Sequence, residues 1–591
     1  MALAYGDFHE VTHQLRFMLF EIGIGLPQQT IEYFITQAHR ECLRRLQQAA
    51  SLEGLTTSPI NSHHIHDFID QLQEQLKHKQ PTLKFFNWQA FKHELDETVA
   101  NEAMAQAYRQ CWQLELRKQA KRFSNFWQWL CEKNNTYEIL QLLEQWGCIG
   151  HPYYPNFRAK IGFSRREVLQ YSPEFNAQIN LHWCALHQRH TYLAAHNLGY
   201  KSLIRKHFPN EYQLWRNHLL FKQYNPDNYL PLPLHPWQWR NQIQQQFSSL
   251  IDSKALILLP HLQVVKPTMA FHTVMPQAAG ACYLKLATAV QTVSANHTIS
   301  QDSIDHGSLL ALWLNHLLKK HDNYRQSLFI AADVASLGVS PTLVPASQCK
   351  QLAVILCDNP MSKQKNGQIP VPLGALFAQS PLSGKPLFID ILNSSGITPH
   401  AYFKDYCQKL LSGQLHLLLH YGIALEAHPQ NTLIVFSNHR PVALIIKDLE
   451  NACLCLHRFY EHVSKPKLSP DSKVMTENLN ELVNKFIHGN FLSNIMGWID
   501  NLSHNYSLAA DDLWQIVHEE VRKQLKDFTS EINVELLNYY KYQLLERDWR
   551  PFSLLPIRLS NVSNACLAPP IFNPLSHLRS SNKRDSRTRI V

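Results

Sequence analysis

The first quarter of the chain has the apolar periodicity of helices. From about Gln29 to Gly147, apolar residues recur every three or four positions among strong helix formers, most regularly between Phe91 and Phe123. The aromatic residues Trp112, Phe126 and Trp129 fall within this region. We expect them to pack in a core, because bulky aromatic side chains on helices more often fill a core than bind a ligand.

Beyond this region the pattern alternates between strands and helices. A stretch punctuated by glycine and proline, from Gly150 to Ser164, predicts an irregular loop. A strand-like run from Cys282 to Val293 comes before a helical run from Asp302 to His321, and another helix is expected near His400 to His420. We find no internal repeat. The pattern predicts a mixed α/β fold with a helical N-terminal part and a helix-rich C-terminal part.

The length sets the number of domains. A chain of 591 residues and 68.5 kDa exceeds one ordinary core, so two or three domains are expected. We predict a helical region over 1–149, a mixed α/β region over 150–395, a C-terminal region over 396–578, and a basic disordered tail over 579–591.

Composition and charge narrow the class of protein. A hydrophobic content of 45% and a charged content of 17% describe a globular protein, and the formal net charge is +9. Part of that charge lies in the tail, where five basic residues outweigh Asp585: Arg579, Lys583, Arg584, Arg587 and Arg589. Such a run favours a solvated, mobile tail over a nucleic-acid or membrane contact. The remaining mild positive charge suits anionic small molecules.

The cysteines and the N-terminus indicate an intracellular protein. The twelve cysteines are scattered, and the spacing of Cys453 and Cys455 fits neither a zinc site nor a redox motif. The N-terminal stretch carries Asp7 and Glu10 and lacks the apolar core of a signal peptide. No apolar run is long enough to span a membrane. We therefore expect a cytoplasmic location.

The most informative stretch runs from Leu425 to Glu450. Two apolar runs flank the segment from Ser437 to Arg440, which predicts a β-hairpin. We expect Asn431, just before the first strand, to lie opposite Asp448, just after the second. Because paired strands lie about 5 Å apart, these two residues and His428 would converge at one end of the hairpin.

These residue types suit a metal–nucleotide complex. Asp448 and Glu450 offer the hard oxygen ligands that Mg²⁺ prefers when it bridges to phosphates. His428 could orient a carboxylate or stabilise developing charge. An ordinary hairpin whose polar ends face water is the alternative explanation.

The same stretch resembles a known family. Residues 426–431 read E-A-H-P-Q-N and are followed by Lys447-Asp448, which is similar to the E-a-H-x-Q-N and R-D elements of the IucA/IucC-type siderophore synthetases. These are ligases, including aerobactin synthetase, that work without a peptide-synthetase assembly line. Further matching blocks follow the order of the family: Gly150-His151-Pro152 with Tyr171–Phe175, Pro233–Gln238, Lys266–Thr273 with Lys285, and Asn573-Pro574-Leu575.

Membership of that family implies a fold and a reaction. The fold is a cupped, three-part α/β architecture likened to thumb, fingers and palm. The reaction uses ATP and Mg²⁺ to activate a carboxylate, commonly of citrate, as an acyl-adenylate with release of pyrophosphate. An amine or hydroxyl nucleophile then displaces AMP. The resemblance also makes a homodimer one option, and it implies neither a nucleic-acid partner nor a membrane span.

The resemblance assigns roles by position. The implied catalytic residues are Lys285, His297 and His428. The implied nucleotide-binding residues are Gly150, His272, Thr273, Lys285, Asn431, Asp448 and Lys541. The implied metal ligands are Asp448 and Glu450.

Two matched elements also have ordinary structural explanations. In the block Pro233–Gln238 we expect Trp237 to be a core residue and Gln238 to tie down backbone, so that the turn is a scaffold. Lys285 has the alternative of being a surface lysine on a half-buried strand.

The chain departs from the family where phosphate should bind. Met269 and Ala270 stand in place of two serines, and His272 in place of an arginine. The threonine and arginine of the next strand become Val293 and His297. An arginine is permanently charged and forked, whereas a neutral imidazole offers one donor, so these changes should weaken phosphate binding.

Three explanations of these departures remain open. Lys285, Mg²⁺ and histidines protonated near phosphate could hold ATP, or basic neighbours such as Arg158 and Lys266 could compensate. Alternatively, the chain is a weakened or inactive family member that binds a polycarboxylate or siderophore, or partners an active synthetase. We favour a working ligase, because four matched residues are retained: Lys285, His428, Asn431 and Asp448. An interaction protein that acts through its tail is a further, weaker option.

Overall fold

The computed structural model describes residues 8–56, 58–79, 86–151, 153–195, 199–292, 297–321, 326–469, 472–551, 555 and 569–578. The predicted basic tail, together with Pro152 and Val293, lies outside these residues. No helix within the described ranges is long and apolar enough to cross a membrane.

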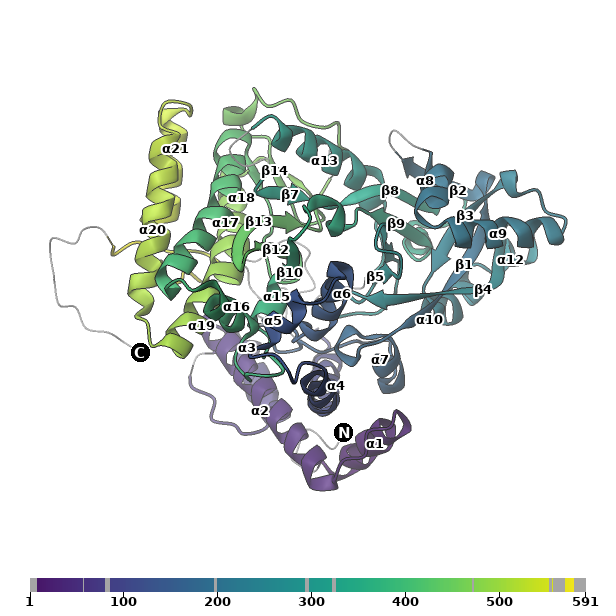
Figure 1. Cartoon of the computed structure of the whole chain (residues 1–591), viewed down its shortest axis with the longest axis horizontal. Coiled ribbons are helices and arrows are strands. Elements are labelled where there is room, and N and C mark those ends of the chain that lie inside the picture. Colours follow the sequence, from purple (N-terminus) through teal and green to yellow (C-terminus); the bar gives the residue numbers. More distant parts are fainter. Residues whose placement is uncertain are drawn as a thin grey trace.

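The N-terminal part is helical, as predicted, and its first helices project from one side of the molecule (Figure 1). Its helices are α1 (His9–Glu21), α2 (Gln28–Leu52), α3 (Ile65–Lys79), α4 (Trp88–Gln119), α5 (Phe126–Cys131) and α6 (Thr136–Trp146). Asparagine side chains at positions 87, 125 and 135 cap α4, α5 and α6 by accepting backbone N–H groups. The aromatic residues predicted to be core, Trp112, Phe126 and Trp129, are all buried.

An eight-stranded sheet forms the centre of the next part. Its strands are β1 (Ile179–His187), β2 (Thr191–Ala195), β3 (Tyr229–Leu234), β4 (Leu256–Pro267), β5 (Thr273–Pro276), β6 (Tyr283–Leu286), β8 (Asp333–Val339) and β9 (Ala353–Cys357). Their order is β2-β8-β9-β6-β5-β4-β1-β3, and each neighbouring pair is antiparallel. The predicted strand from Cys282 is shorter than expected, because regular pairing ends at Leu286.

Two smaller sheets complete the strands. The four-stranded sheet has the order β10-β12-β13-β7 and consists of β7 (Leu328–Ile330), β10 (Ile369–Pro372), β12 (Thr432–Ser437) and β13 (Arg440–Ile446). The three-stranded sheet joins β11 (Ile423–Ala424), β14 (Cys453–Cys455) and β15 (Met475–Thr476). The four-stranded sheet takes strands from both sides of the proposed boundary between 395 and 396, and the domain limits stay a prediction.

Helices dominate the C-terminal part and lie together on one side in Figure 1. They are α17 (Pro399–Tyr421), α18 (Leu479–Phe486), the π-helix η9 (Ile487–Ile495), α19 (Met496–Tyr506), α20 (Ala510–Asp527) and α21 (Val534–Leu545). The predicted helix near His400 to His420 is therefore confirmed as α17. The mixed α/β class, with helix-rich parts at both ends, is confirmed as well.

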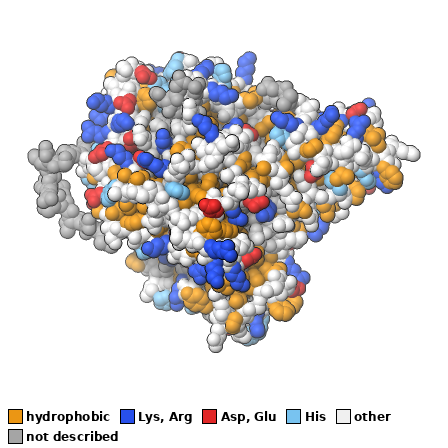
Figure 2. Space-filling view, in the orientation of Figure 1, with side chains coloured by type: hydrophobic (Ala, Val, Ile, Leu, Met, Phe, Trp, Pro, Cys, Tyr) orange, Lys and Arg blue, Asp and Glu red, His pale blue; other side chains and the backbone are white. Residues whose placement is uncertain are grey.

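The remaining helices connect these parts. They are α7 (Arg165–Tyr171), α8 (Tyr200–His207), α9 (Pro209–Phe221), α10 (Pro236–Gln238), α11 (Gln244–Gln246), α12 (Ser248–Asp252), α13 (Gln301–Lys319), α14 (Ala346–Cys349), α15 (Leu373–Phe377) and α16 (Leu387–Ser395). The predicted helical run from Asp302 is α13. Charged side chains of both signs are interspersed with hydrophobic ones over the face drawn in Figure 2.

The turn around α10 is a scaffold, as predicted. Trp237 is buried in the core beside Phe163. The Gln238 side chain donates to the Gln351 carbonyl at 2.9 Å and accepts the Ala289 N–H at 2.8 Å. These bonds tie α10 to the segments that follow β6 and precede β9.

Candidate active site

The hairpin β12–β13 has four of the ten predicted site residues next to its open end: His428, Asn431, Asp448 and Glu450. Asn438 and His439 form its turn with positive φ values of 48° and 64°, and Ser437 pairs with Arg440. A register shift between Val435 and Phe436 then adds one residue to the second strand. Without this shift Asn431 would lie opposite Ile446. The shift moves its partner one position toward Asp448, so the predicted pairing of Asn431 with Asp448 is still wrong by one position. Asn431 faces Lys447, whose N–H donates to the Asn431 carbonyl at 2.9 Å.

The central feature of the site is a buried lysine held between two carboxylates. Lys285 comes from β6, and its side chain is 9% exposed, so it is not a surface lysine. Its Nζ lies 3.0 Å from Asp448 Oδ2 and 2.8 Å from Glu450 Oε2. Burial alone would lower the pKa of Lys285, but the charges of Asp448 and Glu450 raise that pKa well above its ordinary value.

The same contacts act on Asp448. Burial raises the pKa of this carboxyl, but the Lys285 ammonium and the Glu450 N–H, which donates to Asp448 Oδ1 at 2.9 Å, together hold it below its ordinary value. Asp448 is therefore ionised at neutral pH.

A third carboxylate, Asp333, lies beside this pair and was not predicted from the sequence. It begins β8, and the Cys357 thiol lies 3.6 Å from its Oδ1. Burial, together with the negative charges of Asp448 and Glu450, raises the pKa of Asp333 to about 7 despite the opposing effect of Lys285. A Cβ on Gly307 would come within 2.0 Å of Asp333 Oδ2, so the glycine in α13 makes room for this carboxylate.

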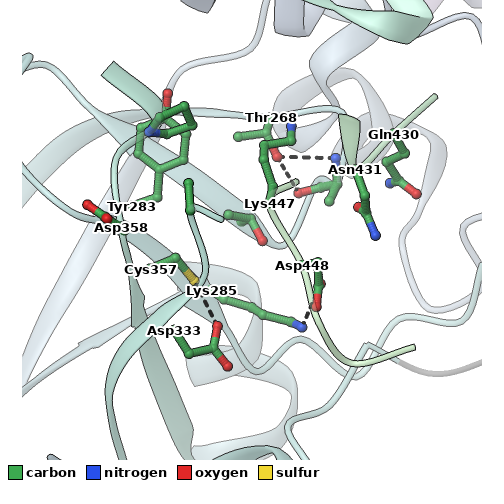
Figure 3. A pocket seen from close by; sticks show the side chains of 14 residues that line it. Thr268, Tyr283, Lys285, Asp333, Cys357, Asp358, Gln430, Asn431, Lys447 and Asp448 are labelled. Carbon is green, nitrogen blue, oxygen red and sulfur yellow. Dashed lines mark hydrogen bonds and ion pairs between the residues drawn. The ribbon is translucent and has the colours of Figure 1, made fainter. Parts of the chain in front are cut away.

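Lys285, Asp333 and Asp448 line an open pocket whose empty volume, open solvent included, is about 450 Å³ (Figure 3); Glu450 is not among the lining residues. In Figure 3 Lys285 extends along one wall to Asp448, and Lys447, Asn431 and Gln430 lie on the other side. The lining residues are Thr268, Ala270, Thr273, Tyr283, Lys285, Ala331, Asp333, Cys357, Asp358, Pro360, Gln430, Asn431, Lys447 and Asp448. The pocket thus brings together Thr273, Lys285, Asn431 and Asp448, four of the seven residues predicted to bind nucleotide, and their contact with nucleotide stays a prediction.

His428 is fixed by the turn that it begins. Its Nδ1 accepts the Gln430 N–H at 3.2 Å, and its carbonyl accepts the Asn431 N–H at 3.1 Å. The other two His-Pro dipeptides use the same contact, since His151 and His235 each accept a backbone N–H through Nδ1. With Nδ1 occupied as an acceptor, His428 carries its proton on Nε2, which lies 3.8 Å from Glu426 Oε2. His428 therefore presents a hydrogen-bond donor.

His272 and His297 form a stacked pair instead of two separate cationic groups. Their ring centroids lie 4.3 Å apart at an interplanar angle of 26°, and His297 Nε2 lies 2.6 Å from Thr292 Oγ1. Burial and the charge of Lys285 lower the pKa of His297 to about 4. Burial and the adjacent His297 and Lys285 likewise lower the pKa of His272 well below its ordinary value. Both imidazoles are therefore neutral at pH 7.

The basic residues considered as compensation are engaged elsewhere or lie off the pocket lining. Arg158 is buried and pairs with Glu102 at 2.7 Å and with Glu174 at 3.5 Å. Lys266 is not among the residues that line the pocket. The cations that line it are Lys285 and Lys447.

Three predicted nucleotide-binding residues, His272, Gly150 and Lys541, are not among the residues that line this pocket. Gly150 has a φ of 82°, and a Cβ there would come within 2.6 Å of the Phe157 ring, so this glycine serves its own turn. Lys541 is exposed on α21, which packs against α18 and α20. Their proposed contacts with nucleotide stay predictions.

The metal-binding potential of the site is limited to two carboxylates. Over the part of the chain that the structure describes, no group of three or more His, Cys, Asp or Glu side chains could hold a metal ion. Asp448 and Glu450 nevertheless suit Mg²⁺, which is usually bound through one or two carboxylates plus substrate phosphates. The Glu450 side chain is 49% exposed, so its oxygens are accessible from the solvent.

Two family models match consecutive parts of the chain. Residues 140–378 match the IucA / IucC family, and residues 400–565 match the family described as ferric iron reductase FhuF-like transporter. Together they include all three carboxylates around Lys285.

Several characterised and uncharacterised proteins are similar to this chain. An uncharacterised protein of Sinorhizobium fredii, y4xN, is 26% identical over 82% of this chain and 80% of its own length. The staphyloferrin A synthase of Staphylococcus aureus is 25% identical over 67% of each chain. A citryl-spermidine/3,4-dihydroxybenzoyl-citryl-spermidine:spermidine ligase of Bacillus anthracis is 25% identical over 78% of this chain and 74% of its own.

Solved structures share the fold. The petrobactin biosynthesis protein AsbB of Bacillus anthracis superimposes with a TM-score of 0.74 at 20% identity, covering 92% of this chain and 96% of its own. ATP-bound aerobactin synthetase IucA of Klebsiella pneumoniae gives a TM-score of 0.66 at 18% identity, covering 87% of this chain and 88% of its own. The likeness extends over nearly the whole molecule.

Proposed function

Because the chain belongs to the IucA/IucC family, we propose that it is an ATP-dependent ligase of siderophore biosynthesis. It would activate a citrate-like carboxylate and condense it with an amine or hydroxyl nucleophile, releasing pyrophosphate and AMP. The observation that carries this proposal is the Lys285 ammonium held by Asp448 and Glu450 in a pocket that Thr273 and Asn431 also line.

The charge balance of the pocket supports a metal-bound nucleotide. The Lys285 ammonium faces Asp448, Glu450 and Asp333, the last about half protonated at pH 7, and the second ammonium of the pocket, Lys447, is paired with Glu144. A bare triphosphate would be repelled by this excess of negative charge. Mg²⁺ bound by Asp448 and Glu450 would supply positive charge to the phosphates, and Lys285 would then be free to donate to a phosphate oxygen.

The chain's residues then orient the reacting groups. In the first step a carboxylate oxygen of the acid attacks the α-phosphorus of ATP, and the bond to pyrophosphate breaks. In the second step the nucleophile's nitrogen attacks the activated carbonyl carbon, and the bond to AMP breaks. The donor that His428 presents at Nε2 would bind the acid's carboxylate, while Thr273 and Lys285 would bind the phosphates. Polar groups held in place before the reaction lower its barrier because they need no reorganisation.

The relatives support a choice of the acid and the amine to test first. One named relative is a citryl-spermidine:spermidine ligase, which supports a citrate-derived acid and a polyamine-like nucleophile. Other di- or tricarboxylates, and N-hydroxylated amines, amino acids or amino alcohols, are the alternatives to screen.

The test is a screen for pyrophosphate release with ATP, Mg²⁺ and candidate acids, with hydroxylamine added to trap the activated acid as a hydroxamate. We expect both signals with citrate or a related acid. The Asp448→Ala variant supplies the background. If no acid gives a signal above that variant, the chain is not a ligase of this kind.

One observation favours a second candidate, a binding protein without ligase activity. His272 and His297 are neutral, and Met269 and Ala270 offer no hydroxyl group, so these four residues would bind phosphate weakly. This candidate predicts saturable binding of a polycarboxylate or siderophore in calorimetry and no binding of MgATP. Binding of MgATP excludes it.

A further inference from the structure

A second lysine of the pocket, Lys447, is held by a carboxylate from a distant part of the chain. Its Nζ lies 2.5 Å from Glu144 Oε1 on α6. The Glu144 side chain is fully buried, and the Lys447 side chain is 14% exposed and lines the pocket. The carboxylate is thus the fixed partner, and the ammonium is the partner that reaches the pocket.

Glu144 also holds the loop that precedes β5. Its Oε2 accepts the Met269 N–H at 3.1 Å, and the Met269 carbonyl accepts from the Gln430 side chain at 3.3 Å. The thioether of Met269 lies against two glycines, since a Cβ on Gly147 or Gly374 would come within 2.5 Å or 3.0 Å of it. One buried carboxylate therefore fixes α6, the Met269 loop and the end of β13 relative to one another.

The Lys447 ammonium has more hydrogen-bond donors than its contact with Glu144 uses. An ammonium group has three donors, and among the described residues Glu144 Oε1 is the one hydrogen-bond acceptor recorded for Lys447 Nζ. Two donors therefore remain for a group in the pocket. Lys285, the other lysine of the pocket, instead donates to both Asp448 and Glu450.

We propose that Lys447 donates to a phosphate oxygen of the bound nucleotide and that Glu144 is its positioning residue. This inference rests on the proposed function, because it places the phosphates in the same pocket. A lysine with no partner would lose the entropy of its four-carbon stem when it binds an anion. Glu144 removes that cost beforehand by holding the ammonium at the wall, and it compensates for the serines that Met269 and Ala270 replace.

The experiment measures the dissociation constant of MgATP by calorimetry in Lys447→Met, Lys447→Arg, Glu144→Gln and the double variant Glu144→Gln/Lys447→Met. We expect Lys447→Met to weaken binding about ten- to one-hundred-fold, the range of one charge-assisted hydrogen bond, and Lys447→Arg to restore most of it. Glu144→Gln should weaken binding about ten-fold. In the double variant, binding should be no weaker than in Lys447→Met alone, because Glu144 acts through Lys447.

The matched control is Asp70→Asn, which breaks a lysine–carboxylate pair with Lys92 of 2.6 Å between α3 and α4, outside the pocket. It should leave MgATP binding unchanged.

The inference is overturned if Lys447→Met binds MgATP as tightly as wild type. It is also overturned if Glu144→Gln weakens MgATP binding as much in the Lys447→Met variant as in wild type. If Glu144→Gln does not fold, the contrast between Lys447→Met and Lys447→Arg decides. Absence of MgATP binding to the wild-type chain would instead refute the proposed function and, with it, this role for Lys447.

Discussion

The raised pKa of Asp333 predicts an unusual dependence of stability on pH. The folded chain holds the pKa of this carboxyl at about 7, whereas the ordinary value is 3.8. Because the folded state binds this proton more tightly than the unfolded state does, the resulting stabilisation is complete below pH 3.8 and is lost as the pH rises to about 7. Between pH 5 and pH 8 the loss is about 2.5 kcal/mol, from 1.36 kcal/mol per pKa unit.

Replacing Asp333 by Asn should remove this dependence. The amide keeps the shape of the side chain beside Gly307 and carries no charge at any pH. The unfolding free energy of Asp333→Asn minus that of wild type should therefore be about 2.5 kcal/mol larger at pH 8 than at pH 5. Urea unfolding of both proteins at pH 5, 6, 7 and 8 measures that difference.

The control is Asp227→Asn, which removes a carboxylate whose side chain is 78% exposed, and its profile should run parallel to wild type. If the profile of Asp333→Asn is also parallel to wild type between pH 5 and pH 8, Asp333 does not titrate there, and the account of three carboxylates around one lysine is wrong.

Three further predictions follow from the site. Lys285→Met should abolish MgATP binding and cost about 1–3 kcal/mol of stability, because it leaves Asp448 and the half-exposed Glu450 without their cation. Calorimetry measures the binding and urea unfolding measures the stability; unchanged MgATP binding would refute this role of Lys285. The pKa of His297 is about 4, so the imidazole stays neutral between pH 8 and pH 6. The MgATP affinity of wild type and of His297→Gln should therefore change equally over this range. An increase in affinity toward pH 6 in wild type alone would mean that this imidazole becomes charged beside phosphate. Gln238→Ala should cost about 2–3 kcal/mol by removing three partly buried hydrogen bonds, with the KM for ATP unchanged; a raised KM would show that the turn does more than support the fold.

The sequence predicted the elements that are determined by short stretches of the chain. The helix Pro399–Tyr421, the hairpin around Asn438 and the scaffold role of Gln238 depend on periodicity, turn chemistry and short-range motifs. The register of the hairpin was missed by one residue, because pairing counted from Ser437 and Arg440 places Ile446 opposite Asn431 and the β-bulge adds one position, not the two that Asp448 requires.

The sequence missed the contacts that depend on tertiary structure. Asp333 is one acidic residue at the start of a strand, and only the packing of β8 against α13 and β9 places it beside Lys285. Glu144 lies within a helical pattern 303 positions from Lys447, and nothing local marks it as the partner of a pocket lysine. The glycine at position 307 was the available clue, since a glycine inside a helix often marks a close approach.

The central claim is that the pocket of Lys285, Asp448 and Glu450 binds ATP together with Mg²⁺. Its most direct test is calorimetric titration of the wild-type chain with ATP, once with Mg²⁺ and once with EDTA, beside the same titrations of Asp448→Asn. We predict saturable binding to wild type that requires Mg²⁺ and is lost in the variant. Absence of binding to wild type, or equal binding to wild type and Asp448→Asn, would contradict the claim.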